Sequence, residues 1–311
     1  MLFPLPMSIP SPEVQSIQIG PLSIHFYALC ILAGIIIAAF WSAKRLGDRG
    51  GDRGAVVDIT FMAVVLGIIG ARFYHVLTHW GFYFSAGRQW WNPFERDAIW
   101  NIWDGGIAIF GALLGGALGV WIATRMNGIR FWSYADALVP GILAAQALGR
   151  LGNWFNHELF GEPTTLPWGL EISSSNPAFP IGLPEQTLFH PTFLYEILWN
   201  LLGIVVLLAI ERKWQPRWGK LFGLYLIWYG IGRFFIEGIR LDTSFILFGL
   251  RTNQLTALIA VLVGIIIIVV QTRRHVGLEP SVYLPGRTHP ADAIGQRTAD
   301  PDKFYHVLEQ K

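Results

Sequence analysis

Charged residues are scarce in this sequence. Of its 311 residues only 14% are Asp, Glu, Lys or Arg, whereas 53% are hydrophobic. Soluble domains carry roughly 25% charged residues, so this chain has too little charge to cover an ordinary soluble surface. The 14 tryptophans agree with this interpretation, because Trp is enriched where a bilayer meets water. The composition therefore predicts an integral membrane protein.

Cysteine is nearly absent as well. Cys30 is the single one and lies inside an apolar run, so an internal disulfide and a thiolate metal site are excluded. A small buried hydrophobic side chain is the ordinary interpretation of such a residue. The net charge of +2 is too weak to suggest a nucleic-acid partner. We expect no nucleic acid, no metal and no cofactor.

The first residues lack basic side chains. Residues 1–21 contain no Lys or Arg, so they lack the basic region of a signal peptide. We expect them to form a short outer segment and the following hydrophobic stretch to be retained as an anchor. No internal repeat stands out, which disfavours a repeat-built transporter.

Long apolar stretches are abundant. Seven of them approach or exceed the roughly 18 residues that cross a bilayer, at residues 22–41, 55–77, 99–124, 133–155, 191–211, 218–239 and 253–271. The sequence predicts an all-α polytopic membrane protein with about seven transmembrane helices in one domain, residues 22–271. The polar, proline-containing tail at 272–311 is expected to be cytoplasmic and disordered.

The basic residues gather on one side of these spans. They follow the first, third, fifth and seventh spans, as Lys44, Arg45, Arg49, Arg53, Arg125, Arg130, Arg212, Lys213, Arg217, Lys220, Arg273 and Arg274. The connection between spans four and five contains four glutamates and no Lys or Arg. By the positive-inside rule the amino terminus is outside and the carboxyl terminus is cytoplasmic.

Two connections on the predicted outer side are long. Residues 79–98 are aromatic and mixed in charge, which predicts an arm in the membrane interface. Residues 157–190 are rich in Gly, Pro and Ser, and we expect a small folded outer cap. Binding residues often lie on loops held by a rigid scaffold.

Ionisable side chains within the spans are costly and tend to mark function. They are Asp58, Arg72, Asp104, Asp136, Arg150, Glu196, Arg233 and Glu237. Arg150 and Arg233 each lie roughly 9–10 Å below the predicted outer end of their span, at 1.5 Å per residue. A single buried Arg can snorkel or form a structural ion pair. Two at matched depth suit a lipid phosphate, because guanidinium grips phosphate with two parallel bonds.

The segment GRLGNWFNHELFG at residues 149–161, where the fourth span meets the outer cap, is the most informative one. It places four polar side chains within one or two turns, Arg150, Asn153, Asn156 and Glu158. Such a density among bulky apolar neighbours is expensive unless the side chains share a network or a ligand. Tyr27 lies at the same predicted depth, near the outer end of the first span.

Two further patterns have a functional and a structural interpretation. Glu237 lies four residues after Arg233, so the two can pair on one helical face, which Arg240 continues. This pair can serve a ligand site or only the fold. The glycines of GGIAIFGALLGG, residues 105–116, allow close approach of a ligand, or simply of another helix.

Three segments together closely resemble prolipoprotein diacylglyceryl transferases: GRLGNWFNHELFG, the HPTFLYE of residues 190–196, and the RxxxExxR of Arg233, Glu237 and Arg240. The resemblance runs from HFYAL around Tyr27 through the seventh span. It implies transfer of the diacylglyceryl group of phosphatidylglycerol to the lipobox cysteine of a preprolipoprotein. The products are a thioether and glycerol phosphate, at the outer face of the bacterial inner membrane.

The resemblance also implies roles for single residues. Arg150 matches the position that binds phosphatidylglycerol, Arg233 the second essential arginine, and Tyr27 the amino-terminal tyrosine. The remaining substrate-binding candidates are Asn153, Asn156, Glu158, Gly161, Glu237 and Arg240. Our hypothesis is that Arg150 and Arg233 clamp the phosphate, that the two asparagines orient the headgroup and that Glu237 fixes Arg233.

One position departs from the family pattern. Where well-known members carry a histidine in the third span, this chain has Phe110, so imidazole cannot be a general base there. A free thiol has a pKa near 8.5, so a base or a cationic field must raise its thiolate fraction. Candidates on the predicted outer side are His25, His75, His157 and His190, with Tyr27 as a proton relay. Each histidine is also explained as an ordinary interfacial residue.

Two other classes of function fit a membrane protein with buried charge. A lipid transporter or flippase predicts polar residues through the whole membrane depth, or helices broken at the midplane. A structural subunit without catalysis would not require the 149–161 motif. The polar cluster in the outer half favours the transferase.

Overall fold

The computed structural model describes residues 8–290, except 21, 86, 88, 93, 96, 97, 103 and 104. The described residues form eight helices: α1 (Phe26–Asp48), α2 (Ala55–Thr78), α3 (Trp80–Tyr83), α4 (Ile109–Met126), α5 (Phe131–Phe155), α6 (Thr192–Trp214), α7 (Lys220–Glu237) and α8 (Thr252–Arg274). The chain divides into two compact units. The first comprises Met1–Ser42 and Ala135–Glu279, and the second Ala43–Tyr134 and Pro280–Lys311.

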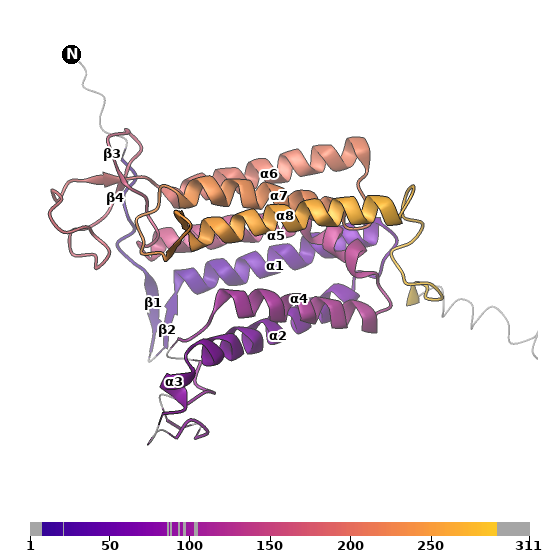
Figure 1. The fold of residues 1–311 in the computed structure, drawn as a ribbon, viewed down its shortest axis with the longest axis horizontal. Coiled ribbons are helices and arrows are strands. Elements are labelled where there is room, and N and C mark those ends of the chain that lie inside the picture. The colour runs from indigo at the N-terminus through magenta and orange to yellow at the C-terminus, as the bar shows by residue number, and fades with distance from the viewer. Residues whose placement is uncertain are drawn as a thin grey trace, which may run out of the picture. The chain divides into compact units, whose positions relative to one another are not determined.

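In the first unit the helices α5 to α8 lie side by side (Figure 1). Small residues let two of them approach closely, since a Cβ added to Gly223 of α7 would lie 2.9 Å from the carbonyl oxygen of Gly264 in α8. Such small-residue contacts are typical of helix packing in membranes. The apolar core of this bundle consists of Val139, Leu143, Leu207, Leu221 and Tyr225.

Asp136, one of the predicted in-span ionisable residues, has a structural role: it binds the start of another helix. Its fully buried carboxylate accepts hydrogen bonds from the backbone N–H groups of Gly219, at 2.8 Å, and Phe222, at 2.9 Å. These groups belong to the first turn of α7, where free N–H groups and the helix dipole favour a negative charge. Asp136 therefore joins α5 to the start of α7.

The segment 157–190, which we call the cap, contains a three-stranded antiparallel sheet. Its strands are β3 (Pro163–Thr164), β4 (Leu170–Glu171) and β5 (Leu188–Phe189), in the order β3-β5-β4. Five apolar residues form its core with the start of α6: Phe160, Leu170, Ile172, Phe189 and Phe193. The amino-terminal segment adds to β4, because Ile9 exchanges two backbone hydrogen bonds of 2.9 Å with Gly169 and Glu171.

Two short hairpins complete the first unit. β1 (Ser16–Ile19) pairs with β2 (Leu22–His25) directly before α1. β6 (Ile246–Leu247) pairs with β7 (Leu250–Arg251) between α7 and α8. The predicted first span at 22–41 is therefore shifted, because its first four residues belong to a strand.

In the second unit α2 packs against α4 through glycines. A Cβ on Gly111 would overlap the carbonyl oxygen of Gly70, and one on Gly115 would lie 3.2 Å from the Cα of Gly70. The structure therefore gives these two glycines of α4 a packing role.

For the third span, predicted at residues 99–124, the predicted start is wrong. α4 begins only at Ile109, since Gly105 and Gly106 have φ angles of +96° and +70°, which a right-handed helix does not allow. Arg72 of α2 binds the non-helical approach, donating to the carbonyl oxygens of Ala98, Ile99, Gly105 and Gly106 at 2.8 to 3.1 Å. Asp104 lies outside the described residues.

The expectation of a disordered tail from 272 is wrong for its first part. α8 continues to Arg274, and Tyr283 is buried in the second unit. The carbonyl oxygen of Tyr283 accepts a hydrogen bond from Arg130 Nε at 2.7 Å, and its hydroxyl accepts one from the backbone N–H of Asp52 at 2.9 Å. Residues 291–311 of the tail and residues 1–7 of the amino-terminal segment lie outside the described residues.

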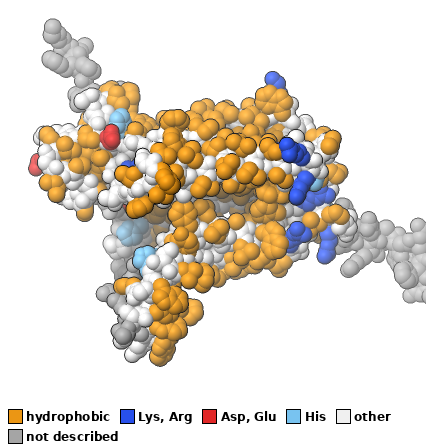
Figure 2. Space-filling view, in the orientation of Figure 1, with side chains coloured by type: hydrophobic (Ala, Val, Ile, Leu, Met, Phe, Trp, Pro, Cys, Tyr) orange, Lys and Arg blue, Asp and Glu red, His pale blue; other side chains and the backbone are white. Residues whose placement is uncertain are grey.

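Five helices within the described residues are long and apolar enough to cross a membrane: α1, α2, α4, α6 and α8. The chain is thus a mostly helical membrane protein. α5 and α7 have 25 and 18 residues and coincide with the predicted fourth and sixth spans, but polar residues lower their hydropathy. In the first unit, the last turns of α6 and α8 carry two basic residues each, and Lys and Arg side chains gather on the surface at the end of the bundle opposite the cap (Figure 2).

Candidate active site

Three helices of the first unit bring Arg150, Glu196 and Arg233 together. Nε of Arg150 lies 2.6 Å from Oε2 of Glu196, and NH1 of Arg233 lies 3.3 Å from Oε1 of the same carboxylate. These residues belong to α5, α6 and α7. Glu196 therefore bridges the two arginines that the sequence predicted as a phosphate clamp, with one oxygen for each.

Glu237 is the second carboxylate of this cluster, and it is fully buried. Its Oε2 lies 2.8 Å from NH2 of Arg233 and 3.4 Å from NH1 of Arg240, while its Oε1 lies 3.0 Å from Nε of Arg251. Nδ2 of Asn253 donates to Oε1 at 2.9 Å. The Arg233–Glu237 pair that the four-residue spacing predicted is present, because both residues lie on one face of α7.

A polar chain continues from Arg150 into the cap. NH1 of Arg150 donates to Oδ1 of Asn153 at 3.2 Å, and Nδ2 of Asn153 donates to Oε1 of Glu158 at 2.8 Å. Asn156 donates to the same oxygen of Glu158 at 3.3 Å. Arg150, both asparagines and Glu158 therefore form one hydrogen-bonded set, which the dense polar motif predicted.

Gly161 ends the motif at a close crossing of backbones. Its N–H donates to the carbonyl oxygen of His190 at 2.9 Å, and it forms a β-bridge with Arg240. A Cβ on Gly161 would lie 2.8 Å from Cβ of His190 and 2.9 Å from the carbonyl oxygen of Ile239. A glycine here lets the cap reach both the start of α6 and the end of α7.

Tyr27 lies in the first turn of α1 and packs against the last turns of α5. A Cβ on Gly152 would lie 3.2 Å from Cε2 of Tyr27, so this glycine makes room for the ring. The half-buried Tyr27 is close enough to Glu158 and Arg150 to interact with both electrostatically. The structure thus places Tyr27 beside the polar set of the motif.

Sequence reasoning missed two members of the cluster, Arg251 and Asp242. Arg251 also donates from NH1 to the carbonyl oxygen of Arg240 and from NH2 to that of Asp242, both at 2.6 Å. The Asp242 carboxylate lies 2.7 Å from Nε of Arg240. Both residues lie just outside the predicted spans, so they were not counted among the ionisable residues at membrane depth. The sequence feature that could have pointed to Arg251 is its position directly before the apolar run of α8.

The ion pairs of the cluster join more guanidinium groups than carboxylates. Four guanidinium groups, of Arg150, Arg233, Arg240 and Arg251, face three carboxylates, of Glu196, Glu237 and Asp242. Glu158 adds a further carboxylate at its edge through the amide of Asn153. Buried charges must be paired in this way, since an unpaired one costs several kcal/mol, about 3–5 when one partner of a buried pair is removed.

Two of the histidine candidates hold structural contacts. Nε2 of His157 donates to the carbonyl oxygen of Pro12 at 2.7 Å, which ties the cap to the amino-terminal segment. The hydroxyl of Tyr195, which accepts from the indole of Trp168 at 3.2 Å, lies 3.0 Å from Nδ1 of His190. Because an indole N–H can only donate, the proton of that hydroxyl is free to point to His190.

Of the other positions that sequence reasoning singled out around the missing imidazole, His75 and Phe110 lie in the second unit. The rings of His75 and His79 stack with centroids 4.1 Å apart. Phe110, in the first turn of α4, lies with its ring centroid 6.1 Å from that of Tyr74. His25, of the first unit, pairs with Ser16 in the hairpin before α1.

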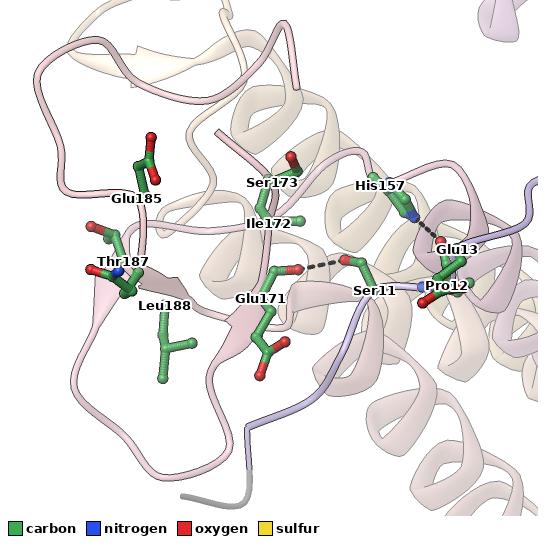
Figure 3. A pocket seen from close by; sticks show the side chains of 11 residues that line it. Ser11, Pro12, Glu13, His157, Glu171, Ile172, Ser173, Glu185, Thr187 and Leu188 are labelled. Atoms are coloured by element: carbon green, nitrogen blue, oxygen red, sulfur yellow. Dashed lines mark hydrogen bonds between the residues drawn. The ribbon is translucent and has the colours of Figure 1, made fainter. Parts of the chain in front are cut away.

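A separate pocket of about 520 Å³ lies between the cap and the amino-terminal segment (Figure 3). Its walls include Ser11, His157, Glu171 and Glu185, and none of the clustered arginines. The Ser11 hydroxyl donates to the carbonyl oxygen of Glu171 at 2.5 Å. The lining is acidic, so this pocket does not suit an anionic lipid headgroup.

Comparison with known proteins agrees with the motifs. The sequence profile described as prolipoprotein diacylglyceryl transferase matches residues 15–270. A relative from Leifsonia xyli subsp. xyli, named phosphatidylglycerol–prolipoprotein diacylglyceryl transferase, is 54% identical over 307 residues, covering 96% of this chain and 92% of the relative. A protein of the same name from Cutibacterium acnes is 48% identical over 269 residues, covering 86% of this chain and 88% of its own length.

Proposed function

The chain belongs to the prolipoprotein diacylglyceryl transferase family, and we propose that the Arg150–Glu196–Arg233 bridge is the phosphate-binding centre of its active site. The enzyme transfers the diacylglyceryl group of phosphatidylglycerol to a prolipoprotein, the first step of lipoprotein maturation. The observation that carries the site is the shared carboxylate: Glu196 holds two guanidinium groups from different helices at one point.

The bridge leaves donors for a ligand. Arg150 uses Nε and NH1 for Glu196 and Asn153, and Arg233 uses NH1 and NH2 for Glu196 and Glu237. Among the described residues, NH2 of Arg150 and Nε of Arg233 donate no hydrogen bond. These two nitrogens can bind the phosphate oxygens of the lipid while Glu196 keeps the arginines in place.

The distribution of charge favours the same ligand. Four guanidinium groups and three carboxylates are ion-paired with one another, whereas the fourth carboxylate, that of Glu158, is separated from Arg150 by the amide of Asn153. The direct surroundings of the two arginines therefore suit the single negative charge of a phosphodiester. Asn153 and Asn156, held by Glu158, are placed to orient the glycerol headgroup. Gly161 and Arg240 support the site from the junction of cap and α7.

The chemistry then follows from the donors. The lipobox cysteine, ionised to its thiolate with its proton released to water, attacks the glyceryl carbon that carries the phosphate. A C–S bond forms, the C–O bond breaks, and glycerol phosphate leaves with the negative charge that the thiolate brought. Arg150 and Arg233 stabilise the charge that develops on the leaving phosphate, which preorganised cations do well in a site with little water. Their positive field also raises the thiolate fraction of the attacking cysteine.

The site suggests a membrane orientation. We infer seven membrane-spanning helices, the five apolar ones together with α5 and α7, with the arm at 79–98 and the cap outside. The amino terminus lies outside and the carboxyl terminus in the cytoplasm of a bacterial inner membrane. This arrangement puts the basic residues after α6 and α8 inside, as the positive-inside rule requires.

The proposal is tested by incubating the purified protein with phosphatidylglycerol labelled in its acyl chains and a lipobox peptide. We expect a labelled thioether on the peptide cysteine and release of glycerol phosphate, and loss of both when Arg150 or Arg233 is replaced by Gln. Movement of lipid between leaflets without a thioether would favour the transporter alternative. Full activity in both variants would show that neither arginine binds the phosphate.

A further inference from the structure

The connection between α7 and α8 displays an unusual amount of exposed apolar surface. We call residues 245–250, Phe-Ile-Leu-Phe-Gly-Leu, the apolar hairpin. Its side chains are exposed to 74% at Phe245, 65% at Ile246, 43% at Leu247 and 89% at Phe248. Soluble proteins rarely expose such a contiguous patch unless it contacts a partner or a membrane.

The turn of the hairpin holds a phenylalanine in a strained backbone conformation. Phe248 and Gly249 have φ angles of +53° and +76° between the paired residues Leu247 and Leu250, which defines a two-residue turn of the I′ type. Asn-Gly is the sequence that this turn prefers, and a bulky side chain at positive φ is a conformational outlier. The chain thus keeps an exposed phenylalanine where a polar residue would fit better.

The hairpin is firmly held at its base. The backbone N–H and the hydroxyl of Thr252 both donate to the carbonyl oxygen of Phe245, at 2.9 and 2.7 Å. Arg251 ties the same base to Asp242 and Glu237. The apolar side chains therefore project from a fixed point next to the arginine–carboxylate cluster.

The position of this base favours lipid as the partner. β7 ends at Arg251 and α8, one of the membrane-crossing helices, begins at Thr252 without a linker. The turn lies three residues away, or about 10 Å in an extended strand, and the headgroup layer of a bilayer is about 5–8 Å thick on each side. These two lengths are similar, so the tip of the hairpin stays close to the bilayer surface.

The distribution of side chains around the hairpin points the same way. Successive side chains of a strand point to opposite faces, so a hairpin that packs one face on a protein partner alternates apolar and polar residues. Phe245, Ile246 and Leu247 are consecutive, apolar and exposed, and residues 243–250 carry no charge. Both faces thus suit an apolar phase that surrounds them, whereas a bound peptide would cover one.

We propose that the apolar hairpin inserts into the membrane interface on the side of the cap and anchors the arginine–carboxylate cluster at the level of the lipid headgroups. Phe248 and Phe245 enter the boundary between headgroups and acyl chains, as aromatic anchors do. Through Arg251 the inserted hairpin is coupled to Glu237 and so to Arg233. This inference does not depend on the roles proposed for Arg150 and Arg233.

The test is the depth of a nitroxide label in a bilayer. The full chain in a Cys30→Ser background receives one cysteine, by Phe248→Cys or, as a second variant, Phe245→Cys, and is reconstituted into vesicles of phosphatidylglycerol and phosphatidylcholine. Ile181→Cys is the matched control, because Ile181 is a fully exposed apolar residue of the cap. Collisions with oxygen, which dissolves in the bilayer, are compared with those of a water-soluble nickel chelate.

We expect an oxygen-to-nickel ratio several-fold higher at positions 248 and 245 than at 181, and unchanged by a lipobox peptide. Nickel accessibility equal to that of position 181 would overturn the proposal. Labels that are accessible to nickel and become immobile only when the peptide is added would also overturn it, and would identify the signal peptide as the partner. A circular dichroism spectrum like that of the parent protein shows that each variant is folded.

Discussion

Each arginine of the clamp makes bonds from more than one nitrogen. Arg150 reaches Glu196 and Asn153, and Arg233 reaches Glu196 and Glu237. Lysine keeps the charge but has a single nitrogen on a flexible stem, so it cannot bind carboxylate and phosphate in this fixed geometry. In the proposed site, these positions therefore require the guanidinium shape as well as its charge.

Arg150→Lys and Arg233→Lys are expected to lower kcat/KM by about 100-fold or more, the effect of removing one preorganised donor from an oxyanion site. Steady-state transfer to a lipobox peptide measures this effect. Arg273→Lys, in the last turn of α8 and outside the cluster, is the control and keeps the parent rate. Lysine variants with the parent rate would show that charge alone suffices.

Glu196 is a positioning residue in this proposal. Glu196→Gln removes the negative charge that holds both arginines, and we expect kcat/KM to fall by about 10- to 100-fold, as small misplacements of reacting groups do. A double-mutant cycle distinguishes positioning from general destabilisation, because Glu196→Gln and Arg150→Lys disturb the same contact and their effects should be less than additive. Glu185→Gln removes an exposed charge of the cap and controls for long-range electrostatics. Fully additive effects would contradict the bridge.

Phe110 tests the departure from the family pattern. Phe110→His introduces an imidazole at this position, and we expect turnover equal to or below that of the parent, because the proposed mechanism obtains the thiolate from the field of the arginines rather than from a base at position 110. The pH profile of kcat is the measurement. A several-fold higher rate with a new ionisation near that of histidine would mean that the site lacks a base.

At the scale of elements, the agreement between sequence and structure depends on the kind of signal. Helix positions followed hydrophobicity well, since α2, α5, α6, α7 and α8 lie within a few residues of their predicted spans. The start of α4 did not, because backbone conformation at Gly105 and Gly106 decided it rather than hydrophobicity. Strands of two residues, such as β3 and β7, have no periodicity that a sequence could reveal.

The junction of cap and α7 gives a prediction at this scale. Gly161→Ala places a methyl group 2.8 Å from Cβ of His190 and 2.9 Å from the carbonyl oxygen of Ile239, so neighbours must move, at a cost of about 1–3 kcal/mol. Gly149→Ala in the same motif meets nothing within 4 Å and is the matched control. Thermal unfolding in detergent should show a lower midpoint for Gly161→Ala alone; equal midpoints would show that the crossing is loose.

At the scale of the whole molecule, the family and its activity were accessible from sequence, because three motifs together are specific. The composition of the charged cluster was accessible only in part. Arg150 and Arg233 stood out as buried charges, whereas Arg251 lies 14 residues after its partner Glu237, at a separation set by the hairpin between α7 and α8. Whether two such residues meet depends on the conformation of the connecting loop, which cannot be predicted from their separation in the sequence.

The distribution of charge over the chain leads to a prediction on topology. The cap contains no Lys or Arg, whereas the connection after α6 contains four within residues 212–220. Moving this connection across the membrane would carry several positive charges against the positive-inside bias. We therefore expect Ile181→Cys of the cap to face outward and Lys213→Cys, at the end of α6, to face the cytoplasm.

A maleimide that does not cross membranes measures this arrangement in a Cys30→Ser background. In intact cells it should label position 181 and leave position 213 unlabelled, and both should react after lysis. Position 274, at the end of α8, should behave like 213, because α7 and α8 return the chain to the same side. An odd number of crossings between 213 and 274 would make those two positions differ. That result would remove α7 from the spanning helices and, with it, the common depth of Arg150 and Arg233.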